Sequence, residues 1–285
     1  MGTSHERKDV MHMSLGELGQ KVKDSVLGVV KGTGDVVSGT IETAKDAVAG
    51  ALSGVGDVAK ALTGTVSDVV TGAMEAVGEI GGSAFNVVKG TVIGVIEGIG
   101  EVTTVTAGVL SDTVRAAIKG TQSIGGDVAE ATAATAEAAV TAVKKTALSL
   151  EDATFSVGRG AIAGAKDVSG DLVATASDTV RGAVNGAKEI GADVTTAARS
   201  TARGLVKGAG EVGGDVVEVA RGAVVGAIHS ARDVGLSAEE AASAAATGAL
   251  EGAGEIGESA VKAVTGVVSG TVEGVKVTVK GDGDK

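Results

Sequence analysis

The fold is decided by a 22-residue unit that reads DTVRGAVNGAK and then EIGADVTTAAR between Asp178 and Arg199. Its first half returns along the chain, for example as DAVAGALSGVG from Asp46. The repeat period is eleven residues, and because alternate units differ, the full unit is 22 residues long. The repeat continues without insertion from Asp24 to about Val275, so one structural solution must serve almost the whole chain.

Apolar residues concentrate at positions 2, 3, 6, 7 and 10 of the eleven-residue unit, counted from its acidic residue. This spacing predicts an amphipathic helix, and eleven residues over three turns keep the apolar stripe nearly straight. We therefore predict an all-α protein of long amphipathic helices with little compact core, folded back into hairpins or a bundle if the chain covers itself. The stripe residues expected to bind lipid or a partner are Val26, Val30, Val36, Ile41, Val48, Leu52, Val69, Ile80, Val92, Ile96, Ile124, Val180, Val184, Ile190, Val194, Leu205, Val212, Val216, Val224, Ile228, Ile256 and Val261.

A second strip, at positions 5 and 9, is glycine in many units. Paired glycines four residues apart permit the close helix approach of the small-xxx-small kind. The candidate close-packing glycines are Gly28, Gly32, Gly50, Gly54, Gly94, Gly98, Gly182, Gly186, Gly204, Gly208, Gly248 and Gly252.

The same repeat explains a motif that resembles a nucleotide site. GAGEVG from Gly208 has the G-x-G-x-x-G spacing of a dinucleotide-binding turn, and GAGEIG repeats it from Gly252. Looser copies occur elsewhere, and the string spans the junction between the two halves of the 22-residue unit. We interpret it as a product of the repeat and expect no cofactor.

Composition excludes several function classes. The 285 residues carry a net charge of −11, with two Phe and no Trp or Tyr, which argues against nucleic-acid binding. Cysteine is absent, as a reducing, cytoplasmic location permits. The first twenty residues lack an apolar run, so no secretory signal is expected. No uncharged run exceeds ten residues, whereas a membrane-spanning helix needs about 20.

Interruptions of the pattern suggest how the chain is divided. SLGE at Ser14, SLED at Ser149 and SAEE at Ser237 match the capping box that begins a helix, so breaks are expected near 146–150 and 234–238. The expected organisation is a disordered leader (1–13), helical repeat segments (14–147, 148–235 and 236–275) and a disordered acidic tail (276–285).

The energetics of one unit require that something cover the stripe. Two glycines and several β-branched residues cost roughly 3 kcal/mol of helix propensity per eleven residues. Burying about three branched side chains returns about 4 to 5 kcal/mol. A near-neutral lipid surface, the chain itself or another copy in a homo-oligomer could provide the cover, and the sequence permits all three.

The stretches VVTGAMEAVG from Val69, NVVKGTVIGVIEG from Asn86 and SDTVRGAVNGAKE from Ser177 resemble the eleven-residue repeats of perilipins. LGVVKGTGDVVSGTIETAKDAVAG from Leu27 is similar to synucleins. The resemblance implies a coat that adsorbs to lipid droplets or membranes through its helices. A weaker similarity to late embryogenesis abundant proteins implies a desiccation protectant.

No residues stand out as catalytic or metal-binding. His5, His12 and His229 are too few and too far apart to suggest a triad or a metal cluster. Acidic residues recur at position 1, where we expect them to pair with Lys and Arg along the same helix. The sequence therefore predicts a non-enzymatic protein without a cofactor or small-molecule substrate, which adsorbs to lipid, protects against drying or packs on itself as a glycine-zipper bundle or filament.

Overall fold

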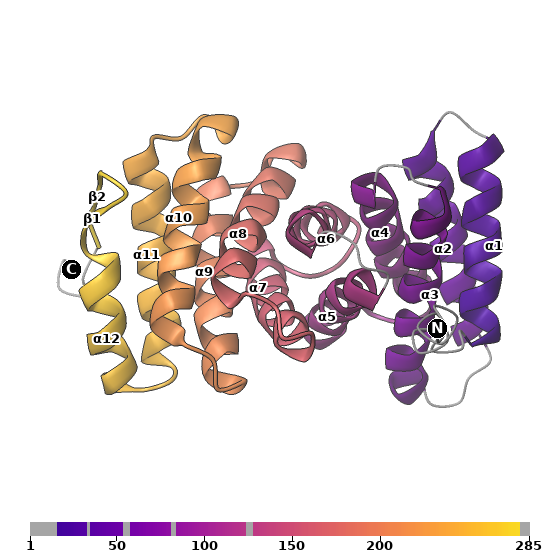
Figure 1. The fold of residues 1–285 in the computed structure, drawn as a ribbon, viewed down its shortest axis with the longest axis horizontal. Helices are drawn as coiled ribbons and strands as arrows, with labels where there is room; N and C mark the ends of the chain where they lie inside the picture. Colours follow the sequence, from indigo (N-terminus) through magenta and orange to yellow (C-terminus); the bar gives the residue numbers. More distant parts are fainter. Residues whose placement is uncertain (1–15, 33–34, 54–57, 81–83, 124–127, 280–285) are drawn as a thin grey trace, which may run out of the picture.

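The computed structural model describes residues 16–32, 35–53, 58–80, 84–123 and 128–279 (Figure 1). The predicted all-α class is confirmed, with twelve helices and one short hairpin in these ranges. The helices are α1 Glu17–Gly32, α2 Val36–Leu52, α3 Val58–Ile80, α4 Ala84–Val102, α5 Ala107–Ser123, α6 Val128–Val143, α7 Leu150–Asp167, α8 Leu172–Glu189, α9 Val194–Glu211, α10 Val216–Val234, α11 Ala238–Gly254 and α12 Glu258–Val268. The strands are β1 Gly270–Val272 and β2 Val275–Val277, which pair antiparallel.

The helices form a two-layered stack. Most helices pack mainly on the helices two places before and after them, and less extensively on their immediate neighbours. Odd-numbered helices therefore make one layer and even-numbered helices the other, and the stack extends from α1 at one end to α12 at the other (Figure 1). This is the one-dimensional arrangement of a helical repeat protein, in which each unit buries its apolar face on adjacent units.

From α7 to α11, each 22-residue unit forms one helix and one turn. In the later part of the chain α8 and α9 are each 18 residues long, and four residues separate them. Within the described residues, the chain reverses inside each of the three predicted helical repeat segments as well as between them. The two predicted breaks do coincide with turns, since α7 begins at Leu150 and α11 at Ala238.

The turn after α8 shows how the chain reverses. Gly191 adopts a left-handed conformation (φ +71°), and the amides of Gly191 and Ala192 donate to the carbonyls of Lys188 and Ala187. This is the pattern by which glycine ends helices. Asp193 then accepts hydrogen bonds from the amides of Thr195 and Thr196 at 2.8 and 2.9 Å, and caps the start of α9.

The other caps follow the same chemistry. Asp171 and Asp215 cap α8 and α10 as Asp193 caps α9. Ser149 and Ser237 cap α7 and α11, as their capping boxes predict. Ser14 lies outside the described residues, as does the predicted leader.

The core is thin and made mainly of Val and Ala. Its largest fully buried side chains include Leu52, Met74, Ile99 and Leu205. Buried threonines such as Thr91 and Thr179 donate to the carbonyl four residues earlier, so their hydroxyl groups are satisfied within the helix. The core can stay thin because small residues allow the helices to lie close together.

The C-terminal end differs from the expected disordered tail. Lys276 and Val277 belong to β2, where they pair with Thr271 and Gly270. The alternation of Val275, Val277 and Val279 fits this hairpin, because Val277 is buried and its neighbours in sequence are exposed. The ordered part therefore extends past residue 275, and residues 280–285 lie outside the described ranges.

Candidate functional site

The glycine strip lies against the backbone of the helix two places earlier. A methyl group added at Gly98 in α4 would lie 2.6 Å from the carbonyl oxygen of Lys45 in α2. The same addition at Gly186 in α8 would lie 2.6 Å from the carbonyl oxygen of Glu137 in α6. Separations this short require the backbone to move. Because glycine has no side chain, these positions let paired helices come close enough for Cα–H···O=C contacts, which recur at helix interfaces.

The remaining strip glycines divide into three groups. Those at which a methyl would likewise meet backbone of the helix two places earlier are Gly94, Gly182, Gly204, Gly208, Gly248 and Gly252. Gly28 and Gly50, on the first two helices, meet nothing within 4 Å. Gly32 and Gly54 have no described surroundings. Among the described residues, the strip is therefore an internal packing surface, except at Gly28 and Gly50 on the first two helices.

The stripe residues are mostly covered by the chain itself. Those fully buried are Val26, Val48, Leu52, Val69, Val92, Ile96, Val180, Val184, Leu205 and Val224. Those half-buried, most of them near helix ends, are Val36, Ile41, Ile190, Val194, Val212, Val216, Ile228 and Val261. Ile256 is 40% exposed and extends over Gly210. The side chains of Val30, Ile80 and Ile124 are outside the described set.

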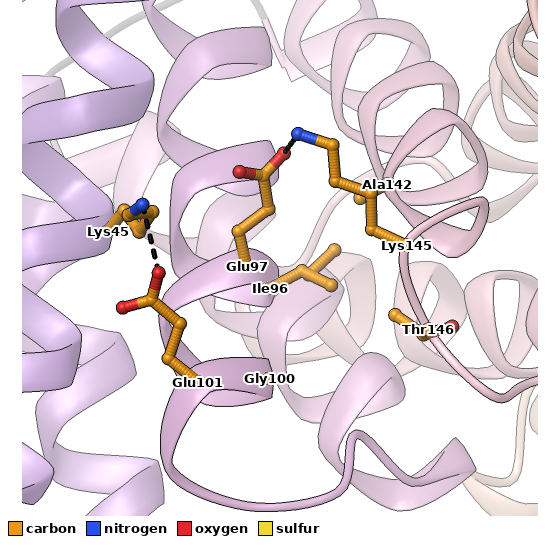
Figure 2. Close-up of a pocket in the computed structure, with 8 residues that line it drawn as sticks. All are labelled: Lys45, Ile96, Glu97, Gly100, Glu101, Ala142, Lys145 and Thr146. Atoms are coloured by element: carbon orange, nitrogen blue, oxygen red, sulfur yellow. Dashed lines mark hydrogen bonds and ion pairs between the residues drawn. The ribbon is translucent and has the colours of Figure 1, made fainter.

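The stack changes character between α4 and α6. Ala138 and Ala142 in α6 occupy the repeat positions held by Gly94 and Gly98 two units earlier and by Gly182 and Gly186 two units later. The methyl groups prevent the approach that glycine allows elsewhere. A groove of about 330 Å³ opens there, lined by Ile96 and Glu97 of α4, Ala142 of α6 and the turn that follows α6 (Figure 2). In the sequence, this groove is marked only by the replacement of glycine with Ala138 and Ala142, which the apolar periodicity does not reveal.

Ion pairs line this α4–α6 seam in place of glycine contacts. Lys145 reaches from the turn after α6 to Glu97 at 2.7 Å, while Lys45 of α2 pairs with Glu101 at 2.9 Å on the other side of α4 (Figure 2). A second groove of about 500 Å³ shares Glu97 and Lys145 and continues to the end of α8. The seam is thus a charged groove between two closely packed blocks, α1–α4 and α5–α12.

Lys89 is the most enclosed cation of the seam. Its ammonium group lies 2.7 Å from Glu137 of α6 and 2.9 Å from Glu189 at the end of α8. Desolvation by burial lowers the pKa of Lys89, but the hydrogen bonds to Glu137 and Glu189 outweigh this effect and the pKa is raised. The lysine is therefore held in its charged form, as a bridge across three helices.

Charged residues elsewhere also join different helices. Arg115, Arg159 and Arg203 each contact an acidic residue 52 positions later, on or at the end of the helix two places along. The expectation that such pairs form along one helix was wrong for these residues, although Arg181 and Asp178 do pair within α8 at 3.0 Å. Hydrogen bonds from Arg115 lower the pKa of Asp167, which favours the ionised pair.

The chemistry of these surfaces is that of packing and ion pairing. Within the described ranges, no group of three or more His, Asp or Glu side chains is placed to hold a metal ion. His229 is exposed and lies 3.1 Å from Glu273, while His5 and His12 fall outside those ranges. The G-x-G-x-x-G string from Gly208 covers the end of α9 and the turn after it, so it does not follow a strand. None of the helices described is long and apolar enough to span a bilayer.

No protein-family model matches the chain, and no curated protein is significantly similar to it.

Proposed function

We propose that this is a non-enzymatic structural protein in which the glycine strip and the Val/Ala/Ile stripe pack helix on helix within the chain. One observation carries the proposal. The repeated glycines lie where a methyl group would meet backbone of the second helix along, at Gly98, Gly186 and Gly252 among others. A helix lying on lipid gains nothing from such glycines, which cost about 1 kcal/mol each in propensity.

Adsorption to a near-neutral lipid surface is a second candidate. It is favoured by the amphipathic pattern that single helices keep, as in α8, where Val180 and Val184 are buried while Arg181 and Lys188 are exposed. The resemblance to perilipins and synucleins adds support for this candidate. It requires the helices to separate first, because most of the described stripe residues are covered by neighbouring helices. A cytoplasmic location fits both candidates and the cysteine-free sequence.

A matched pair of double variants tests the proposal. Gly182→Ala with Gly186→Ala adds two methyl groups against the α6 backbone, and should cost about 1–3 kcal/mol for each clash. Gly64→Ala with Gly266→Ala adds the same groups at helical positions with nothing within 4 Å, and should leave stability unchanged or raise it by about 1 kcal/mol per site. Thermal unfolding followed by circular dichroism without lipid measures both.

The same experiment separates the alternatives. A cooperative helical melt of the unmodified chain, weakened only by the Gly182 and Gly186 changes, supports the self-packed protein. Little helix in water with a sharp gain on near-neutral vesicles would instead support the lipid coat. Helix gained only on drying would support the protectant, and either of these two outcomes would refute the proposal.

A further inference from the structure

The two ends of the helical stack are finished differently. At the C-terminal end the β1–β2 hairpin packs on α11, where the amide of Thr278 donates to the Ser243 hydroxyl at 3.1 Å. The last helix, α12, is only 11 residues long and exposes Glu258 and Lys262. Repeat proteins need such capping elements because the final unit would otherwise expose its packing surface.

The N-terminal end lacks an equivalent cap among the described residues. Gly94 of α4 occupies the repeat position of Gly50 two units later, and a methyl group there would meet the backbone at Ile41. Gly50 itself, like Gly28 on α1, is exposed with nothing within 4 Å. The strip that packs helices together inside the chain therefore continues onto a free surface. In sequence, each of these glycines begins a G-x-x-x-G spacing, which is typical of paired helices.

A groove between α1 and α2 adds apolar area and charge to this end. Its volume is about 530 Å³, and Leu18 and Val22 contribute apolar lining. Lys21, Glu42 and Asp46 supply charges of both signs, and none of the three takes part in an ion pair within the described chain. A surface that carries both signs can pair with itself, because a two-fold axis sets each group of one copy against a different group of the other.

We propose that the outer surface of α1 and α2 binds the same surface of a second copy in an isologous dimer. The glycine strips of the two copies face each other, and Lys21 of each copy lies against Glu42 and Asp46 of the other. The proposal rests on the proposed function, since it extends the glycine packing beyond one chain. Head-to-tail stacking is disfavoured because the hairpin and α12 cover the surface that a further copy would need.

The test uses the full chain and Gly28→Ala with Gly50→Ala. Analytical ultracentrifugation should show the unmodified protein at twice the 27.3 kDa chain mass, and the variant should dissociate at least tenfold more readily because its methyl groups hold the copies apart. The thermal midpoint of the variant, measured where both proteins are monomeric, should be unchanged or higher, because both positions are open helical sites. Gly64→Ala with Gly266→Ala is the control and should keep the dimer.

Charge exchange provides an independent readout. Lys21→Glu should weaken the dimer, and Lys21→Glu combined with Glu42→Lys and Asp46→Lys should restore it. A protein that folds cooperatively but stays monomeric at high concentration would overturn the dimer and leave the proposed function intact. A ladder of growing oligomers would also overturn it, in favour of head-to-tail stacking. Failure of the proposed function would show separately, as loss of the cooperative helical fold itself.

Discussion

At the scale of single residues, Asp193 decides where α9 begins. Its carboxylate accepts two backbone amides at the start of the helix, just after left-handed Gly191 ends α8. The sequence alone does not distinguish Asp193 from the other acidic residues of the repeat. In the structure it lies between α8 and α9 and caps α9. The side-chain and backbone hydrogen bonds from Thr195 and Thr196 lower the pKa of Asp193.

Replacing Asp193 with Ala should destabilise the protein by about 1 kcal/mol at neutral pH, because the first amides of α9 lose their acceptor. A carboxyl group whose pKa is lowered by folding stabilises the fold above its unfolded pKa, and this contribution is lost as the pH falls through the lower, folded pKa. Urea unfolding at several pH values measures the difference between the two proteins. It should shrink in strong acid, and a constant difference would contradict the role of the ionised cap. Asp193→Asn, which keeps an acceptor, should show a smaller loss.

At the scale of the helix, position within the 22-residue unit decides what a stripe residue contributes. Val180 lies in the middle of α8 and is fully buried, whereas Val194 begins α9 and is half-buried. Both occupy apolar positions of the eleven-residue repeat, which treats them alike. Their burial differs because the chain turns once in every 22 residues. The turn places Val194 at the end of a helix and leaves Val180 in the middle of one.

This difference predicts unequal costs for equal truncations. Val180→Ala should destabilise by about 2 kcal/mol, since it removes buried methyl groups and leaves a cavity in a close-packed layer. Val194→Ala should cost less than about 1 kcal/mol, because its side chain is already partly solvated. Chemical unfolding of the two variants compares them directly. Equal losses would mean that the stripe acts as the uniform surface inferred from the repeat alone.

At the scale of the whole molecule, the α4–α6 seam divides the stack. Glycine packing joins α2 to α4 and α6 to α8, but across the seam Ala138 and Ala142 replace it. Lys89 and Lys145 supply ion pairs instead, and ion pairs are screened by salt whereas close packing is not. Among the described helices, we therefore expect the α4–α6 seam to respond more to ionic strength than the interfaces that glycine packing also joins.

Spin labels at Ser53→Cys and Ala174→Cys, on opposite sides of the seam, should show a broader distance distribution in high salt than in low salt. Labels at Ala174→Cys and Ser269→Cys, both within the later block, should show no such change. Glu97→Gln with Lys145→Gln should broaden the first distribution even in low salt, by removing one of the bridging pairs. Pulsed electron–electron double resonance measures the distances between the labels. Equal behaviour of the two labelled pairs would contradict a distinct joint.

The sequence by itself determined the local structure of this protein. The spacing of Val180, Val184 and Ala187 makes the segment helical whatever covers it, and the boxes at Ser149 and Ser237 mark true helix starts. Gly191 and Asp193 are also residue types that typically end and begin helices, so the sequence contains the signal for this turn. They were missed because an eleven-residue period describes a helical face and is unchanged by a stop signal that recurs every second unit.

The tertiary structure alone decided what covers the stripe. An apolar face gains similar free energy against lipid, another copy or another helix of the same chain, so amphipathic periodicity does not choose among them. The choice here depends on contacts between residues about fifty positions apart, such as Gly186 against Glu137 and Arg159 against Glu211. The seam is likewise a tertiary feature. Ala142 favours a helix as any alanine does, and its methyl group affects the structure only because it lies between α6 and α4.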